Sequence, residues 1–222
     1  MISAQTTPGA TASLALARAV ARSVAAGTPL SSAGLFALSA DAFGGTLAEG
    51  AFSPRDAYDA AELGLHLHLL RLGLPLGDDP SDALAEVERL SALLPSQTRR
   101  TTAQNDFQQF STPAAYAALC AWVSGAGARG SARGTRVLEP SAGTGALCTF
   151  ALASGATVHA NELCPRRADL LAALLREAGQ DPAETLTREN ADHLDAILPP
   201  AVRAHVVLLN PPDTAGEVGG TS

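Results

Sequence analysis

The chain has no lysine, few aromatic residues and no long hydrophobic run. All 15 of its basic residues are arginine, against 22 acidic residues, and the formal net charge is −7. This balance excludes a broadly basic protein that coats nucleic acid. No apolar run approaches the roughly 20 residues that a helix needs to cross a bilayer, so we expect no membrane partner. With 46% hydrophobic and 17% charged residues, the 222-residue chain can bury a core of its own.

Cysteine is also scarce. The three cysteines, Cys120, Cys148 and Cys164, are odd in number and far apart in the sequence. Their spacing fits neither a metal-binding motif nor a disulfide framework, so we predict no metal site. Free cysteines favour a reducing compartment, and we expect a cytoplasmic protein.

The charge is unevenly distributed along the chain. Residues 96–136 contain five arginines and one acid, whereas the segments before and after this basic band are both acidic. Such a band can contact phosphates, which makes DNA a predicted partner. A solvated, arginine-rich linker explains the pattern equally well.

The first 95 residues predict a helical region of unknown role. Ser53 is expected to start one helix, because Pro54 follows in the first turn and Asp56 lies three residues after the cap. His66 and His68 are two residues apart and would face different sides of a helix, so we expect ordinary core or surface histidines. Helices are predicted over 11–26, 53–72 and 81–94, and no helix over the Gly- and Ser-rich stretch 31–50.

Residues 96–134 predict a polar linker followed by a helix. Thr112 is expected to cap this helix, which then continues to about Val123. Its predicted buried face consists of the larger side chains Tyr116, Leu119, Trp122 and Val123.

Residues 135–222 show a different pattern, in which short strands alternate with helices. Strands are predicted over 135–139, 156–161, 184–188 and 205–209, and helices over 146–153, 166–178 and 192–198. This alternation is typical of the α/β class and predicts a partial, doubly wound, Rossmann-like parallel sheet of about four strands.

The residues that follow the first predicted strand form a Gly-rich loop. In such sheets, ligands bind beyond the carboxyl ends of the strands. Gly143 and Gly145 allow a sharp turn and a close approach of the backbone to a ligand. The loop reads Glu139, Pro140, Ser141, Ala142, Gly143, Thr144 and Gly145.

Polar residues also follow the other three predicted strands. Glu162 comes 23 residues after Glu139, where a carboxylate can accept hydrogen bonds from ribose hydroxyls. Asp192 can accept from an adenine amino group or cap the helix that follows, and both interpretations stay open. Asn210 precedes Pro211 and Pro212, which form a rigid bend. The Asn side-chain oxygen and the Pro211 carbonyl can together bind an exocyclic amine.

These motifs resemble a known family. Residues 137–145, together with Leu209, Asn210, Pro211 and Pro212 downstream, are similar to class I S-adenosylmethionine-dependent methyltransferases. The closest similarity is to DNA adenine amino-methyltransferases, and residues 109–113 resemble the upstream motif of that group. The order of the motifs is that of the type I and type IIG-like branch of restriction–modification enzymes.

The resemblance implies a role for each motif. Phe110, Thr112 and Pro113 would close over the amino-acid part of S-adenosylmethionine, so residues 96–134 would be a linker and a cofactor-closing helix. Glu139, Pro140, Ser141, Ala142, Gly143 and Gly145 would form the cofactor loop. Glu162 would hold the ribose and Asp192 would meet the adenine. Asn210, Pro211 and Pro212 would form the catalytic motif, in which Asn210 and the Pro211 carbonyl bind the target amine.

Two features distinguish this chain from the family. Position 213 is Asp, where the family has an aromatic residue that stacks on the flipped base, and the family's sheet has more strands than the four predicted here. We therefore expect a truncated methyltransferase that is inactive alone, or one that a second chain or a missing C-terminal half completes. Two alternatives stay open: a non-catalytic S-adenosylmethionine-binding remnant, and a methyltransferase that acts on a protein glutamine.

Overall fold

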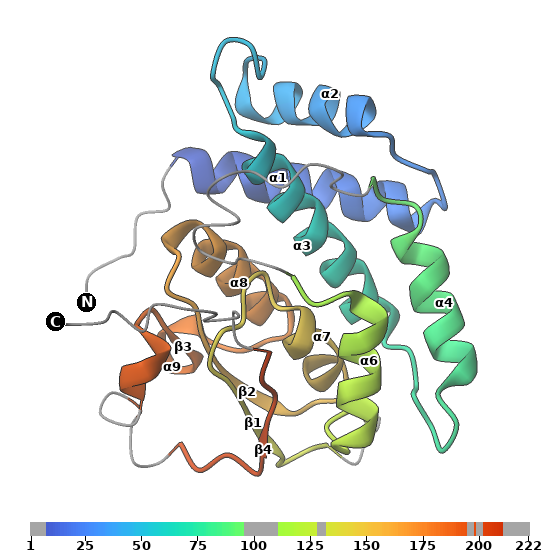
Figure 1. Ribbon diagram of the computed structural model, residues 1–222, viewed down its shortest axis with the longest axis vertical. Helices are drawn as coiled ribbons and strands as arrows, with labels where there is room; N and C mark the ends of the chain where they lie inside the picture. The colour runs from blue at the N-terminus through green and yellow to red at the C-terminus, as the bar shows by residue number, and fades with distance from the viewer. Residues whose placement is uncertain (1–7, 96–110, 128–131, 195–197, 199–201, 211–222) are drawn as a thin grey trace, which may run out of the picture.

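The computed structural model describes residues 8–95, 111–127, 132–194, 198 and 202–210. In these residues, helices pack on one sheet of four parallel strands, as Figure 1 shows. The predicted α/β class with a partial Rossmann-like sheet is therefore confirmed. Within this part of the chain, none of the helices combines the length and the hydropathy of a membrane span.

The described part of the chain begins with the helices α1 (Pro8–Ala25), α2 (Ser32–Phe43), α3 (Pro54–Leu72) and α4 (Ser81–Ser91). The predicted start of α3 is confirmed. The Ser53 hydroxyl accepts a hydrogen bond from the Asp56 N–H, and the Asp56 carboxylate accepts one from the Ser53 N–H, which completes a capping box. The helix ends at Gly73, whose left-handed conformation closes the last turn.

Helix α2 corrects the prediction that residues 31–50 contain no helix. The Ser31 side chain accepts a hydrogen bond from the Gly34 N–H, and Gly44 adopts the left-handed conformation after the last turn. Serine and glycine therefore mark the two ends of a helix here, whereas the sequence pattern suggested a loop.

The sheet contains β1 (Arg136–Glu139), β2 (Thr157–Asn161), β3 (Leu186–Thr187) and β4 (Val206–Val207) in the order β3-β2-β1-β4. Helix α7 (Ala146–Ala153) connects β1 to β2, and α8 (Pro165–Glu177) lies between β2 and β3 in the chain. The chain moves outward from β1 to β3 and then returns to the other side of β1 as β4. Ligands of such sheets bind at this reversal of direction, between the carboxyl ends of β1 and β4.

The third predicted strand is shorter than expected. The Asp181 side chain caps the short helix α9 (Pro182–Thr185), so that only Leu186 and Thr187 remain as β3. Within the predicted helix 192–198, the structure describes the 3-10 turn Ala191–His193 and the helical residue Leu194, whose carbonyl accepts from the Leu198 N–H, while residues 195–197 lie outside the described part of the chain.

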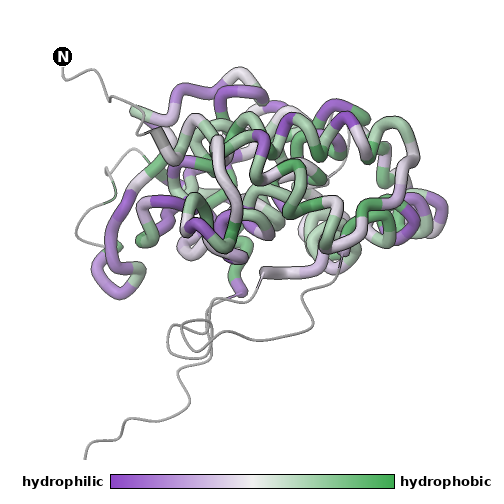
Figure 2. Tube along the Cα trace, turned by 90° about the horizontal axis from the view of Figure 1, so that it is seen from above, coloured by the Kyte–Doolittle hydropathy of each residue, from purple (hydrophilic) through white to green (hydrophobic). Residues whose placement is uncertain are grey.

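One hydrophobic core runs through both the helical region and the sheet region. Helix α3 packs against α1 on one side and against α7 and α8 on the other. Leu16 of α1, Leu63 of α3 and Leu171 of α8 belong to the same buried cluster. In Figure 2 the hydrophobic stretches run mostly through the middle of the molecule. The core thus continues across residue 95, where the sequence suggested a domain boundary.

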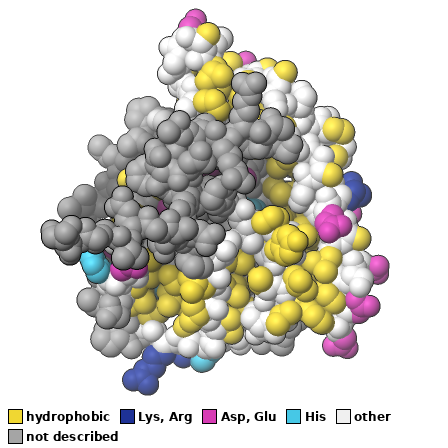
Figure 3. Space-filling view, in the orientation of Figure 1, with side chains coloured by type: hydrophobic (Ala, Val, Ile, Leu, Met, Phe, Trp, Pro, Cys, Tyr) yellow, Lys and Arg dark blue, Asp and Glu magenta, His cyan; other side chains and the backbone are white. Residues whose placement is uncertain are grey.

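Helix α6 (Ala114–Val123) turns a different face to the core than predicted. Tyr116 is 65% exposed and Val123 is 72% exposed, whereas the helix packs against α7 and buries Ala114, Ala117, Ala118 and Ala121. Small side chains allow two helices to approach closely, which explains why the large residues point outward. Figure 3 shows hydrophobic side chains gathered on this side of the molecule.

Candidate functional site

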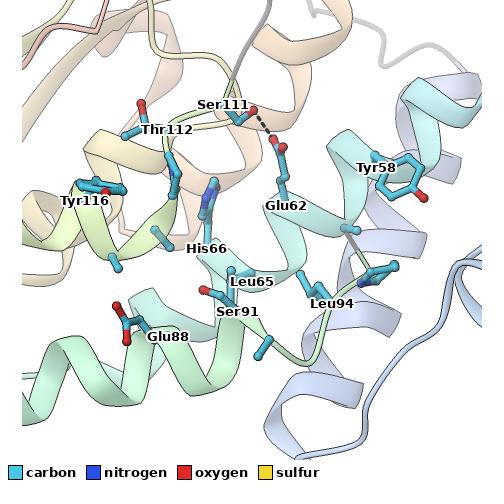
Figure 4. A pocket seen from close by; sticks show the side chains of 16 residues that line it. Tyr58, Glu62, Leu65, His66, Glu88, Ser91, Leu94, Ser111, Thr112 and Tyr116 are labelled. Carbon is cyan, nitrogen blue, oxygen red and sulfur yellow. Dashed lines mark hydrogen bonds between the residues drawn. The ribbon is translucent and has the colours of Figure 1, made fainter. Parts of the chain in front are cut away.

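Two cavities adjoin each other, and the smaller lies near the carboxyl ends of β1 and β4. The smaller has a volume of about 30 Å³, and the larger, of about 720 Å³, opens between α3, α4 and α6 (Figure 4). Ser111 and Thr112 line both. The smaller cavity is lined by Ser111, Thr112, Glu139, Ser141, Ala142, Gly143, Thr144, Ala146, Leu147, Arg167 and Asn210.

The Gly-rich loop turns directly above the end of β1. Gly143 and Gly145 have φ values of 58° and 99°, which side chains rarely adopt. A Cβ atom on Gly145 would collide with Leu174 of α8, and one on Gly143 would stand 3.5 Å from the Nη1 atom of Arg167. Conformation therefore favours glycine at both positions, and lack of space also requires it at Gly145.

Glu139 ends β1 as a buried carboxyl group. It is 1% exposed, and only its Oε1 atom accepts a hydrogen bond, from the Ser141 N–H at 3.3 Å. Its Oε2 atom is buried and has no hydrogen-bond partner among the described residues. Burial raises the pKa of Glu139 to about 8, and the Glu162 carboxylate adds to this rise. The group therefore carries a proton at neutral pH and offers an unused polar atom beside the smaller cavity.

Glu162 holds the Gly-rich loop from the neighbouring strand. Its Oε2 atom accepts from the Gly143 N–H at 2.8 Å, and its Oε1 atom accepts from the Cys164 N–H at 2.8 Å. The residue is buried and lines neither cavity. To bind a ribose, as its position in the sequence suggests, the Glu162 carboxylate must leave the Gly143 N–H.

Asn210 and Thr112 are brought together from segments 98 residues apart. The Asn210 Nδ2 atom donates a hydrogen bond to the Thr112 Oγ1 atom at 2.9 Å. This contact leaves the Asn210 carbonyl oxygen available as an acceptor. The predicted capping role of Thr112 is wrong, because Pro113 occupies the N-cap position of α6 and none of the described side chains caps this helix.

The remaining predicted site residues are distributed as follows. Pro113 lines the larger cavity, while Pro140 and Gly145 belong to the loop without lining either cavity. Asp192 is exposed and also lies outside both linings. The cap of the 3-10 turn that contains Asp192 is Asn190, whose side chain accepts from the Asp192 N–H. The predicted residues Phe110, Pro211 and Pro212 lie outside the described part of the chain.

Asn161 connects the loops that follow three strands. Its Nδ2 atom donates to the Pro140 carbonyl at 2.9 Å and to the Glu189 carbonyl at 2.8 Å. Its Oδ1 atom accepts from the Thr187 hydroxyl and from the Glu189 N–H. One buried carboxamide thus fixes the relative positions of the loops after β1, β2 and β3.

Helix α3 contributes charged groups that the sequence analysis did not identify. Asp56, Asp59 and Glu62 face Arg166 and Arg167 in the first turn of α8. Arg166 pairs with Asp59 at 2.7 Å and with Asp56 at 3.1 Å. Burial raises the pKa of Asp59 to about 6, although Arg167 and Arg166 oppose this shift. A sequence signal was present, since two arginines at a helix N-terminus are unfavourable unless acids neutralise them.

His66 connects the same helix to the Gly-rich loop. It is buried, and its Nδ1 atom lies 3.3 Å from the Thr144 carbonyl oxygen. Burial lowers the pKa of His66 to about 4, so the ring is neutral at neutral pH and donates from Nδ1. Figure 4 shows His66 on the wall of the larger cavity, near Thr112. The structure thus places this histidine in the core, which is one of the two locations left open by the sequence.

The fold and the cavities define an α/β structure with a polar crevice at the reversal of strand direction. In the described residues, no group of three His, Cys, Asp or Glu side chains is arranged to hold a metal ion, and the three cysteines are unpaired. Comparison of the chain with protein-family models, curated proteins and solved structures found no match.

Proposed function

We propose that this protein is an S-adenosylmethionine-dependent methyltransferase of the type that methylates the adenine amino group in DNA. One observation carries the proposal: the Gly-rich loop after β1 and Asn210 after β4 line the same small cavity. This is the crevice where α/β sheets of this topology bind their ligands. The motifs that resemble the methyltransferase family are therefore adjacent in space.

The residues present fit the amino-acid part of the cofactor. The buried Oε2 atom of Glu139 lacks a hydrogen-bond donor among the described residues, and an ammonium group would supply one. A cavity of about 30 Å³ holds a small polar group and not a nucleoside. The adenosine part would therefore lie along the loop, after Glu162 has left the Gly143 N–H.

Asn210 is suited to hold the target amine. When bound, S-adenosylmethionine supplies an electrophilic methyl group on its sulfonium. The Asn210 side chain is held by the hydrogen bond from its Nδ2 atom to Thr112, so that its Oδ1 atom can accept a hydrogen bond from the target amine. A second acceptor, the Pro211 carbonyl, would favour a pyramidal nitrogen whose lone pair points at the methyl group. The contribution of the protein is positioning and electrostatics, and the base must leave the DNA stack to reach the site.

Calorimetric titration with S-adenosylmethionine tests the cofactor site, and transfer of a labelled methyl group to unmethylated DNA tests the activity. Binding together with transfer supports the proposal. Absence of binding refutes it. Transfer to a glutamine-containing peptide and not to DNA would identify the protein-directed alternative.

A second candidate function is cofactor binding without methyl transfer. It is favoured by Asp213, which stands where the family has an aromatic residue. Stacking of a base on an aromatic ring typically contributes about 1–3 kcal/mol, and a carboxylate cannot provide it. Saturable binding of S-adenosylmethionine, with no transfer to DNA or peptide, would establish this function.

Two observations bear on the proposed partners. The outer edge of β4 has no neighbour among the described strands, and Val207 and Leu209 are 55% and 56% exposed. We propose that a strand of a second chain, or a further segment, pairs there. Light scattering tests this pairing, and a monomer that stays soluble at high concentration argues against self-association.

Arg136 belongs to the basic band that is proposed to contact DNA. It lies at the amino end of β1, away from the candidate site, and donates a hydrogen bond to the Arg203 carbonyl.

A further inference from the structure

Arg167 is a buried cation in the wall of the smaller cavity. It lies in the first turn of α8 and is 6% exposed. Its Nη2 atom donates to the Ser111 hydroxyl at 2.8 Å, and its Nη1 atom lies 3.5 Å from the position that a Cβ atom on Gly143 would occupy. The guanidinium therefore reaches both the Gly-rich loop and the segment that precedes α6.

The acids of α3 satisfy Arg167 only in part. Asp59 is 2.7 Å from Arg166 but 3.5 Å from the Nε atom of Arg167, which makes no hydrogen bond to any described residue. The Oε2 atom of Glu62 lies 3.9 Å from Arg167 and accepts instead from the Ser111 and Thr144 hydroxyls. A buried guanidinium with an unused donor is costly unless a ligand or another polar group completes its hydrogen bonds.

The lining of the smaller cavity contains an acidic residue as well as Arg167. Glu139 presents an unpartnered carboxyl oxygen, and Arg167 presents a cation. The α-amino acid end of a ligand carries an ammonium and a carboxylate two bonds apart. The cation of Arg167 matches the carboxylate, and the Glu139 carboxyl group matches the ammonium once it has given up its proton.

We propose that Arg167 binds the carboxylate of the methionine part of S-adenosylmethionine. This inference rests on the proposed function and adds a specific residue to it. The planar fork of arginine can donate two parallel hydrogen bonds to a carboxylate, which a lysine ammonium cannot match. Arg167 would therefore distinguish cofactors that carry this carboxylate from those that lack it.

The test compares two ligands that differ only in the carboxylate: S-adenosylmethionine and decarboxylated S-adenosylmethionine. Calorimetry on the whole chain should show that the wild type binds the first about 10- to 100-fold more tightly, as expected for a charge-assisted pair. In Arg167→Gln this ratio should fall to near one, while the affinity for the decarboxylated ligand changes little. Arg167→Lys should give an intermediate ratio.

Arg166→Gln is the matched control. Arg166 is the adjacent residue, pairs with the same Asp59, and does not line the cavity. Its replacement perturbs the same ionic cluster and should leave the ligand ratio at the wild-type value. Circular dichroism establishes that each variant is folded before titration.

The possible results separate this inference from the proposed function. If the wild type binds neither ligand, the proposed function itself fails. If the wild type binds both ligands equally well, or Arg167→Gln keeps the wild-type ratio, the role of Arg167 is refuted while the cofactor site stands. If Arg167→Gln does not fold, the wild-type ratio and Arg167→Lys still decide the question.

Discussion

Replacing Glu139 with Gln should stabilise the protein, and the gain should grow with pH. Glu139 is buried with a pKa of about 8, whereas the unfolded value is 4.5. Between these values the folded state binds the proton more tightly, so the wild type loses stability as the pH rises. Gln has the same size and no charge, and it therefore removes this loss.

The expected magnitude follows from the pKa difference. A shift of about 3.5 units, at about 1.36 kcal/mol per unit, sets an upper limit of roughly 5 kcal/mol. For such a group, the free-energy difference between variant and wild type should rise by about 2.5 kcal/mol from pH 5 to pH 7. A further rise of about 1.4 kcal/mol should follow between pH 7 and pH 9.

Urea unfolding followed by circular dichroism at pH 5, 7 and 9 measures this difference. Asp59 and His66 also have shifted pKa values, but they are present in both proteins and cancel in the comparison. Glu184→Gln, on the exposed side of α9, makes the same chemical change as a control. A constant difference between Glu139→Gln and wild type over this pH range would refute the description of Glu139 as a buried, protonated acid.

Three further predictions concern the same site. The ammonium group of S-adenosylmethionine should lower the pKa of Glu139, so that binding at pH 7 releases up to about one proton. Calorimetric titrations in buffers of different ionisation enthalpy measure the number of protons released. A proton release that persists in Glu139→Gln would contradict this prediction. Gly145→Ala should lower the free energy of unfolding by about 2 kcal/mol or more, because alanine disfavours the φ of this position and its Cβ atom would collide with Leu174. An unchanged urea midpoint would contradict this prediction. Glu162→Ala should weaken S-adenosylmethionine and its decarboxylated form about equally, roughly 10- to 100-fold, if the carboxylate binds ribose; calorimetry that shows unequal losses would place Glu162 elsewhere.

Local sequence patterns predicted most elements correctly because their causes are local. The start of α3 depends on Ser53 and Asp56, which lie three residues apart, and helix α7 has the predicted bounds. The error at α2 had a local cause too, since glycine in the first turn concealed the cap at Ser31. The error at α6 was not local, because only the approach of α7 determines that alanines face inward.

The sequence predicted those residues of the candidate site that directly follow a strand, because the carboxyl ends of parallel strands lie at the same edge of the sheet. The loop after β1 and Asn210 were expected to converge, and both line the smaller cavity. Arg167 and the acids of α3 were missed because they meet across more than 100 residues of chain. Asp56, Asp59 and Glu62 are spaced three residues apart on one face of a mostly buried helix, which is the pattern that could have revealed them.

The position of α3 limits how this architecture can be divided or recombined. The helix fills the interior next to α7 and α8 and also carries the counter-charges for two arginines. A chimaera that contained only the segment from β1 onward would expose the apolar surfaces of α7 and α8 that α3 covers. It would also leave Arg166 and Arg167 without the acidic partners that α3 provides. Any transplant of the crevice must therefore bring its N-terminal support with it.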